Sequence, residues 1–200
     1  MAVRFISDAP AITARWTLRK ESLAMPHMPA TGVSGLDLYL KDQGQWHFAG
    51  RAPARALTNE FSLIHDRRPL RREFMLYLPL YNGIKALELG IPASSHLEPA
   101  PVRTHKPIVF YGTSILQGGC ASRPGMAYPA IIGRHLEWPT INLGFSGNAM
   151  SEPEVAQLLA EHGRLAGDPE LSQSAQQPYA PALLERCQLD LRHTFSATAN

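Results

Sequence analysis

Residues 107–118 read PIVFYGTSILQG, and this stretch decides the fold of the second half of the chain. The apolar run from Pro107 to Tyr111 is continuous, which is typical of a strand buried on both faces of a parallel sheet. The run leads directly into a loop that carries Ser114. Ligands of open α/β sheets bind beyond the carboxyl ends of the strands, so this serine is well placed to attack a ligand. The same serine could instead cap the first turn of a helix.

The residues after this strand continue the pattern of an α/β protein. Residues 128–136 predict a helix that tolerates Pro129 in its first turn, and residues 140–143 predict a second short strand. Residues 144–148 (GFSGN) predict a loop, and residues 151–154 (SEPE) resemble a capping box for another helix. The order strand, loop, helix, strand, loop, helix predicts the start of a doubly wound α/β domain.

Gly147 lies in the loop after the second strand, so we expect it to line the same crevice as Ser114. Because glycines let backbone amides approach a ligand closely, the two loops together could hold a developing oxyanion. Taken alone, GFSGN is equally typical of a glycine-rich turn. Two such loops at consecutive strand ends are more specific than either one. Ser114 is therefore the candidate nucleophile and Gly147 the candidate oxyanion donor.

Residues 1–92 have the periodicity of strands. Apolar and polar side chains alternate in several stretches that turn signals separate, and each stretch can bury one face of a sheet. The pattern predicts an antiparallel β-sandwich. The side chains expected in its core are Trp16, Leu38, Leu76 and Leu78. Asp37 is expected to satisfy backbone donors at a strand edge rather than to act in catalysis. Residues 93–106 contain a proline-rich run without periodicity, which predicts a linker between two domains.

Composition excludes several classes of protein. Hydrophobic residues make up 44% of the 200 residues and charged residues 18%, which is typical of a soluble globular protein. The formal charge is +2, and the basic run at residues 67–72 is interpreted as a solvated turn rather than a nucleic-acid site. Cys120 and Cys187 form neither a disulfide framework nor a metal-ligand pattern, and Cys120 is expected to be a small buried side chain.

No apolar run reaches the length of a membrane span, and the N-terminus lacks the layout of a signal peptide. We therefore expect no membrane partner. The sequence also has no cluster of metal ligands, so we expect no metal, and the basic run gives no reason to expect a nucleic-acid partner. The compartment and the oligomeric state stay open.

The two loops and the N-terminal half together resemble one family. Residues 107–118, 121–126 and 141–148 are similar to conserved blocks of the SGNH (GDSL-like) hydrolases, with Thr113 where aspartate is commoner. Residues 35–39 (GLDLY) resemble the Gly-x-Asp-Leu-Tyr signature of the β-sandwich module that precedes one esterase branch of that family.

This resemblance implies a flavodoxin-like α/β domain after the sandwich, and a serine esterase that uses Ser114 as nucleophile and Gly147 as oxyanion donor. It also implies small-molecule or carbohydrate ester substrates, often acetyl esters, and no cofactor.

The chain departs from the family pattern after residue 161. The family's third block, which supplies an asparagine to the oxyanion hole, has no counterpart. Asp190 and His193 spell the family's Asp-x-x-His block but follow Ser114 too closely, so we interpret them as a coincidence. We therefore expect a partial SGNH domain at residues 107–163, an irregular tail at 164–200, a chain shortened at both ends, and poor esterase activity.

Other candidates are weaker. His27 lies between prolines, and His135 is expected on the surface of a helix. The alternative hypothesis is a non-catalytic, glycan- or protein-binding β-sandwich with an inert α/β remnant.

Overall fold

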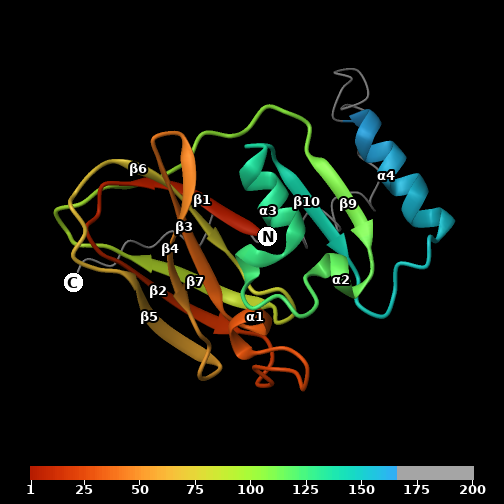
Figure 1. Ribbon diagram of the computed structural model, residues 1–200, viewed down its shortest axis with the longest axis horizontal. Coiled ribbons are helices and arrows are strands. Elements are labelled where there is room, and N and C mark those ends of the chain that lie inside the picture. The colour runs from red at the N-terminus through yellow and green to blue at the C-terminus, as the bar shows by residue number, and fades with distance from the viewer. Residues whose placement is uncertain (166–200) are drawn as a thin grey trace.

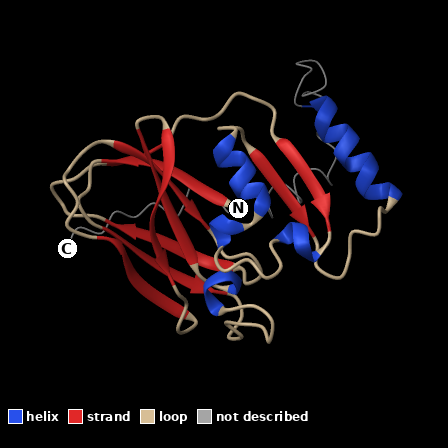
Figure 2. Cartoon of the chain, viewed as in Figure 1, coloured by secondary structure: helices blue, strands red, loops and turns tan. Residues whose placement is uncertain are grey.

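The N-terminal half folds into two antiparallel sheets (Figures 1 and 2). The computed structural model describes residues 1–165. The larger sheet has the spatial order β4-β3-β6-β1-β8 and the smaller sheet the order β5-β2-β7. The strands of the larger sheet are β1 (Ala2–Ser7), β3 (Leu36–Asp42), β4 (Gln45–Ala52), β6 (Arg72–Tyr77) and β8 (Leu97–Pro99). Those of the smaller sheet are β2 (Ile12–Leu18), β5 (Thr58–Ile64) and β7 (Ile84–Gly90), and the short helix α1 (Ala30–Val33) precedes β3.

The core of this half lies between the two sheets. Period-two alternation directs one face of each strand inward, and the side chains buried there form one large apolar cluster. A second, smaller cluster holds the buried Tyr39, Met75 and Tyr77 of the larger sheet. Trp16, Leu38, Leu76 and Leu78 are all buried, which confirms the predicted core. The Trp16 indole also finds a polar partner, because its Nε1 donates to the Ser34 carbonyl oxygen at 3.2 Å. The N-terminal half is therefore a β-sandwich with a closed core.

The second half is a short parallel sheet with helices. Strand β10 pairs with β9 in parallel, from Thr140 opposite Ile108 to Gly144 opposite Gly112. Helix α3 lies between the β-sandwich and this sheet, as Figure 1 shows. The elements are β9 (Ile108–Gly112), α2 (Ser114–Gln117), the 3₁₀ helix η1 (Pro124–Met126), α3 (Tyr128–His135), β10 (Thr140–Gly144) and α4 (Pro153–Leu165). The predicted order of strands, loops and helices is confirmed.

Two local predictions in this half were wrong. Strand β9 is not buried on both faces: the Val109 side chain is 37% exposed, and the other residues of the strand are only half-buried. Among the described strands, β9 pairs with β10 alone, so its other edge has no paired strand. The capping box does not form either, because Ser151 has a left-handed backbone (φ +65°) and the Glu152 carbonyl oxygen accepts the first bonds of α4.

The structure also places the basic run, part of the expected linker and part of the expected tail. Residues 67–71 of the basic run are exposed between β5 and β6, as expected for a solvated turn, whereas Arg72 begins β6 and is half-buried. Strand β8 lies inside the segment expected to be a linker and pairs with β1. Of the tail expected to be irregular at residues 164–200, the first two residues still belong to α4, and residues 166–200 lie outside the described part. Within residues 1–165, no helix combines the length and apolarity that crossing a membrane requires.

Candidate active site

Ser114 is the first residue of α2 and lies two residues beyond the end of β9. Its carbonyl oxygen accepts a hydrogen bond from the Gly119 amide at 2.7 Å and another from the Tyr81 hydroxyl at 3.2 Å. Among the described residues, the Ser114 hydroxyl has no hydrogen-bond partner. The serine is thus held through its backbone, while its hydroxyl is available to a ligand.

The loop after the second strand ends at the same edge of the sheet. Gly144 lies opposite Gly112, and the Phe145 amide donates to the Gly112 carbonyl oxygen at 2.8 Å. The Asn148 amide then donates to the Phe145 carbonyl oxygen at 3.0 Å, which closes a turn with Gly147 in its third position. Gly147 has a φ of +76°, the left-handed backbone that a type II turn requires there and that glycine adopts most readily.

Two backbone amides at this edge are free. In the part of the chain that the structure describes, neither the Ser114 amide nor the Gly147 amide donates a hydrogen bond. The Ser114 amide is free because donors in the first turn of a helix have no intrahelical acceptor. The space around Gly147 is open, since a Cβ there would meet nothing within 4 Å. Free amides near a free serine hydroxyl are what acyl transfer needs to stabilise a tetrahedral oxyanion.

Close packing holds the two loops together. A Cβ on Gly144 would lie 2.1 Å from the Gln117 amide nitrogen, so β10 can end against α2 only at a glycine. Asn142 adds two hydrogen bonds, donating from Nδ2 to the Leu116 carbonyl oxygen and accepting at Oδ1 from the Gly144 amide, both at 2.9 Å. Sequence reasoning missed Asn142, because an asparagine in a short strand carries no signal of a partner in another element.

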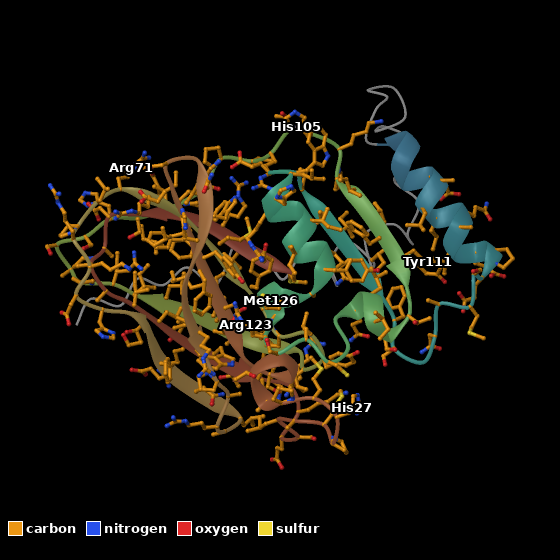
Figure 3. All side chains as sticks on the ribbon, viewed as in Figure 1. His27, Arg71, His105, Tyr111, Arg123 and Met126 are labelled. Atoms are coloured by element: carbon orange, nitrogen blue, oxygen red, sulfur yellow. The ribbon has the colours of Figure 1, made fainter. Side chains whose placement is uncertain are left out.

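Asp37 holds the two halves of the chain together. Strand β3 lies between β4 and β6, so Asp37 does not sit at a sheet edge as expected. Its carboxylate is fully buried, and Oδ2 accepts from the Gly125 amide at 3.0 Å and lies 3.1 Å from Arg123 Nε. The expectation that Asp37 satisfies a backbone donor is met, but that donor belongs to the α/β half. Figure 3 shows Arg123 and Met126 where the two halves meet.

Burial dominates the ionisation of this carboxyl group. Removal of water raises the pKa of Asp37 to about 6, although the hydrogen bond from Gly125 and the charge of Arg123 both lower it. Its second oxygen, Oδ1, is buried without a hydrogen-bond partner among the described residues. The hydrogen bond and the ion pair therefore replace only part of the hydration that the carboxylate loses on burial.

Arg134 of α3 strengthens the same interface. Its guanidinium lies 3.8 Å from the ring centroid of Tyr39 and 5.1 Å from that of Tyr77, within the range of cation–π attraction. The same guanidinium donates to the Gly125 carbonyl oxygen at 2.8 Å. Asp37 and Tyr39, the third and last positions of the GLDLY stretch, are thus both used in contacts with the α/β half.

The remaining residues that the sequence offered as candidates have no described contact with Ser114. His27 lies on the exposed loop before α1 (Figure 3), and His135 is exposed at the end of α3, as expected. Cys120, expected to be buried, is exposed with a left-handed backbone. Asp190 and His193 fall outside the described residues. Among the side chains that the structure describes, those of residues 1–161, none is therefore bonded to the Ser114 hydroxyl as a base.

A cavity of about 390 Å³ lies between the β-sandwich and the α/β half. Its walls come from β1 and β6, from α3 and β10, and from Arg103 and Trp138. Neither Ser114 nor Gly147 lines it. The cavity therefore belongs to the interface between the two halves and not to the edge of the sheet where the free hydroxyl and amides lie.

Comparison with known proteins agrees with this architecture. Residues 1–97 match the GxDLY family, described as the N-terminus of SGNH-hydrolase-type esterases. Residues 105–164 match the GDSL-like lipase/acylhydrolase family. A comparison with curated protein sequences finds no match.

Solved structures give further matches. A Bacteroides ovatus protein assigned as a GDSL-like lipase is 42% identical, with a TM-score of 0.76 over 80% of this chain and 47% of its own. A salicylyl-acyltransferase of a tetracycline biosynthetic pathway (16% identity, TM-score 0.59) is matched over 80% of this chain and 44% of its own. A family two carbohydrate esterase of Clostridium thermocellum (16% identity, TM-score 0.51) is matched over 73% of this chain and 44% of its own.

The chain therefore spans less than half the length of each of these proteins, and the two more distant ones share its fold. Both halves match in the order that the sequence predicted: the chain belongs to the SGNH-type, GDSL-like esterase family, with a GxDLY N-terminal module followed by a GDSL-like lipase/acylhydrolase region.

Proposed function

We propose that this chain carries the nucleophile and the oxyanion donors of a serine ester hydrolase. The observation that carries the proposal is the juxtaposition at the ends of β9 and β10. Ser114 there has a free hydroxyl and a free amide, and Gly147 in the adjacent loop has a second free amide. Membership of the GDSL-like lipase/acylhydrolase family supports ester chemistry at this place.

The proposed reaction has two attacks on one acyl carbon. Ser114 Oγ adds to the ester carbonyl while a base takes its proton, and the amides of Ser114 and Gly147 donate to the oxyanion that forms. Collapse of this intermediate breaks the bond to the alcohol, which leaves with a proton. Water then attacks the acyl-enzyme in the same way, which releases the carboxylic acid and restores the serine hydroxyl.

We further propose that this chain by itself performs the reaction slowly. A serine hydroxyl is a weak nucleophile near neutral pH and needs a positioned base, and none of the described side chains, at residues 1–161, is bonded to its hydroxyl. Loss of a single oxyanion donor costs on the order of 100-fold or more in well-studied serine hydrolases. With two backbone donors and without the asparagine side chain expected of the family, the oxyanion is stabilised less, and the rate of hydrolysis is therefore expected to be low.

Small acyl groups are the proposed substrates, with acetyl esters of carbohydrates as the first to be tried. The carbohydrate part of the proposal is motivated by the fold shared with the Clostridium thermocellum carbohydrate esterase. Acetylated xylo- and cello-oligosaccharides, compared with p-nitrophenyl acetate and p-nitrophenyl butyrate, test both parts. Faster release of butyrate than of acetate would contradict the preference for a small acyl group.

A fluorophosphonate probe tests the nucleophile directly, because its covalent adduct accumulates even when the serine reacts slowly and does not turn over. We expect the wild-type chain to be labelled once, at Ser114, and Ser114→Ala to be unlabelled. Ser146→Ala is the matched control, since it removes the hydroxyl of the neighbouring loop and should still be labelled. Labelling that persists in Ser114→Ala would refute the assignment.

Hydrolysis of p-nitrophenyl acetate tests the rate. We expect the wild-type chain to exceed Ser114→Ala by a small margin, and His193→Ala to equal the wild type. Brisk turnover that both substitutions abolish would establish His193 as the base and contradict the slow-rate proposal. Absence of labelling, together with retention on immobilised oligosaccharide, would instead favour the non-catalytic binding module.

A further inference from the structure

Gln117 touches both halves of the chain at the end of the nucleophile helix. Its side-chain Nε2 donates to the Leu80 carbonyl oxygen at 3.0 Å, and its Oε1 accepts from the Ser146 amide at 2.8 Å. Leu80 lies in the β-sandwich, three residues after β6, and Ser146 lies in the turn that contains Gly147. One half-buried side chain therefore connects the sandwich to the proposed oxyanion loop.

The two contacts require a side chain that both donates and accepts, as an amide does. The Leu80 carbonyl can only accept and the Ser146 amide can only donate, so the bridging group must donate at one end and accept at the other. A carboxylate accepts at both ends, an ammonium donates at both ends, and an apolar side chain does neither. The two partners also fix which end of the Gln117 amide is nitrogen and which is oxygen.

The sandwich side of the bridge is itself held in place. The Leu80 amide donates to the Gly32 carbonyl oxygen of α1 at 3.3 Å, and a Cβ on Gly118 would lie 2.7 Å from the Leu80 side chain. The next residue, Tyr81, binds the Ser114 carbonyl oxygen. Two consecutive residues of the sandwich therefore reach both ends of α2.

We propose that Gln117 is a positioning residue that ties the turn at residues 145–148 to the β-sandwich, so that the GxDLY module sets where the Gly147 amide lies relative to Ser114. The structural tie stands on the two hydrogen bonds, and its consequence for the oxyanion rests on the proposed esterase function. The turn has few other restraints: Ser146 and Gly147 are exposed, and no neighbour lies within 4 Å of a Cβ on Gly147. The Gln117 bond holds the residue immediately before the oxyanion donor.

Amide hydrogen exchange of Ser146 in the full chain, followed by NMR, tests the tie without using activity. Removal of the acceptor in Gln117→Ala should speed exchange by about tenfold, as expected for the loss of one hydrogen bond. Gln117→Glu should leave exchange near the wild-type rate, because its carboxylate still accepts from the Ser146 amide. Tyr81→Phe, which removes only the neighbouring contact to Ser114, is the control and should also leave it unchanged.

The rate of fluorophosphonate labelling at Ser114 tests the sandwich end of the tie. Gln117→Glu cannot donate to the Leu80 carbonyl, so labelling should slow by a factor on the order of ten, as it should in Gln117→Ala. Equal labelling of Gln117→Glu and wild type would overturn the role of the sandwich, and unchanged Ser146 exchange in Gln117→Ala would overturn the tie itself. Faster exchange in Gln117→Ala with no labelling of any variant would refute the esterase proposal and leave the tie in place.

Discussion

The β-sandwich and the α/β half bury their apolar side chains to very different degrees. In the sandwich, a single cluster of buried residues fills the space between two sheets. In the α/β half, β9 and β10 are half-buried at best, and large apolar side chains such as Ile115 and Met150 are exposed. A side chain that water already reaches loses little when it is truncated, so the stability of this chain is concentrated in the sandwich.

This difference explains why the interface between the halves matters. The α/β half has little core of its own among the described residues, so it depends on contacts with the larger sheet. Those contacts combine apolar packing of Ala130 with the polar contacts of the Asp37 carboxylate and the Arg134 guanidinium. The Gln117 amide adds a hydrogen bond to the loop after β6. The β-sandwich therefore supports the α/β half and the candidate site on it. Substitutions in the two halves and at their interface test this dependence.

Truncation of one leucine in each half should give the largest contrast. Leu76 is fully buried in β6, whereas Leu136 after α3 is 52% exposed. Leu76→Ala should lower the free energy of unfolding by about 2–5 kcal/mol. Leu136→Ala should change it by no more than about 0.5 kcal/mol. Chemical denaturation followed by tryptophan fluorescence measures both, and equal losses would contradict the concentration of stability in the sandwich.

Asp37 should give the interface a pH dependence. Its folded-state pKa of about 6 lies above the ordinary value of 3.8, so the folded protein binds this proton more tightly than the unfolded chain does. Its stabilising contribution is complete below pH 3.8 and is lost as the pH rises through about 6, with each pKa unit corresponding to about 1.4 kcal/mol.

The difference in unfolding free energy between wild type and Asp37→Asn isolates this group from the other carboxyls. It should fall between pH 4 and pH 6 and stay level above that range. If the ion pair with Arg123 outweighed desolvation, the difference would rise with pH instead.

Two glycines of the candidate site offer a matched pair. Gly144→Ala would place a Cβ 2.1 Å from the Gln117 amide nitrogen, and relief of this clash should cost about 1–3 kcal/mol and separate the two loops. Gly147→Ala meets no neighbour and should cost only about 1 kcal/mol for its left-handed backbone. Thermal unfolding ranks the two variants. A larger loss in Gly147→Ala would show that the turn is packed more tightly than its surroundings indicate.

The smallest effect should come from an ion pair at the rim of the interface. Lys41 on β3 lies 2.7 Å from Glu137 after α3, and both side chains are partly exposed. Such pairs contribute about 1 kcal/mol or less and are screened by salt. Glu137→Gln should therefore lower stability slightly in dilute buffer and not at all in molar sodium chloride. A loss that persists in high salt would indicate a packing role for Glu137.

Local patterns predicted most of the fold but not its exceptions. Apolar and polar residues alternate within each of the strands β2, β3, β6 and β7. This signal is local to each strand, and the sequence predicted all four. Strand β4 was not predicted. It is an edge strand with four of its eight residues exposed, and the alternation of Trp46 and Phe48 with Gln45 and His47 is too short to indicate a strand by itself. The prediction of a capping box was wrong because residues 151–154 have the required residue types, but Ser151 adopts a left-handed backbone.

The candidate site divides in the same way. The sequence by itself determined that Ser114 and Gly147 follow two successive strands, because strand periodicity and glycine spacing are properties of short segments. Only the tertiary structure decided that Asp37 binds Gly125 across 88 residues, that Gln117 bridges Leu80 and Ser146, and that β9 is half-exposed. The physical reason is that burial and hydrogen-bond partnership belong to pairs of elements brought together by folding, and a single stretch of sequence does not specify its neighbour.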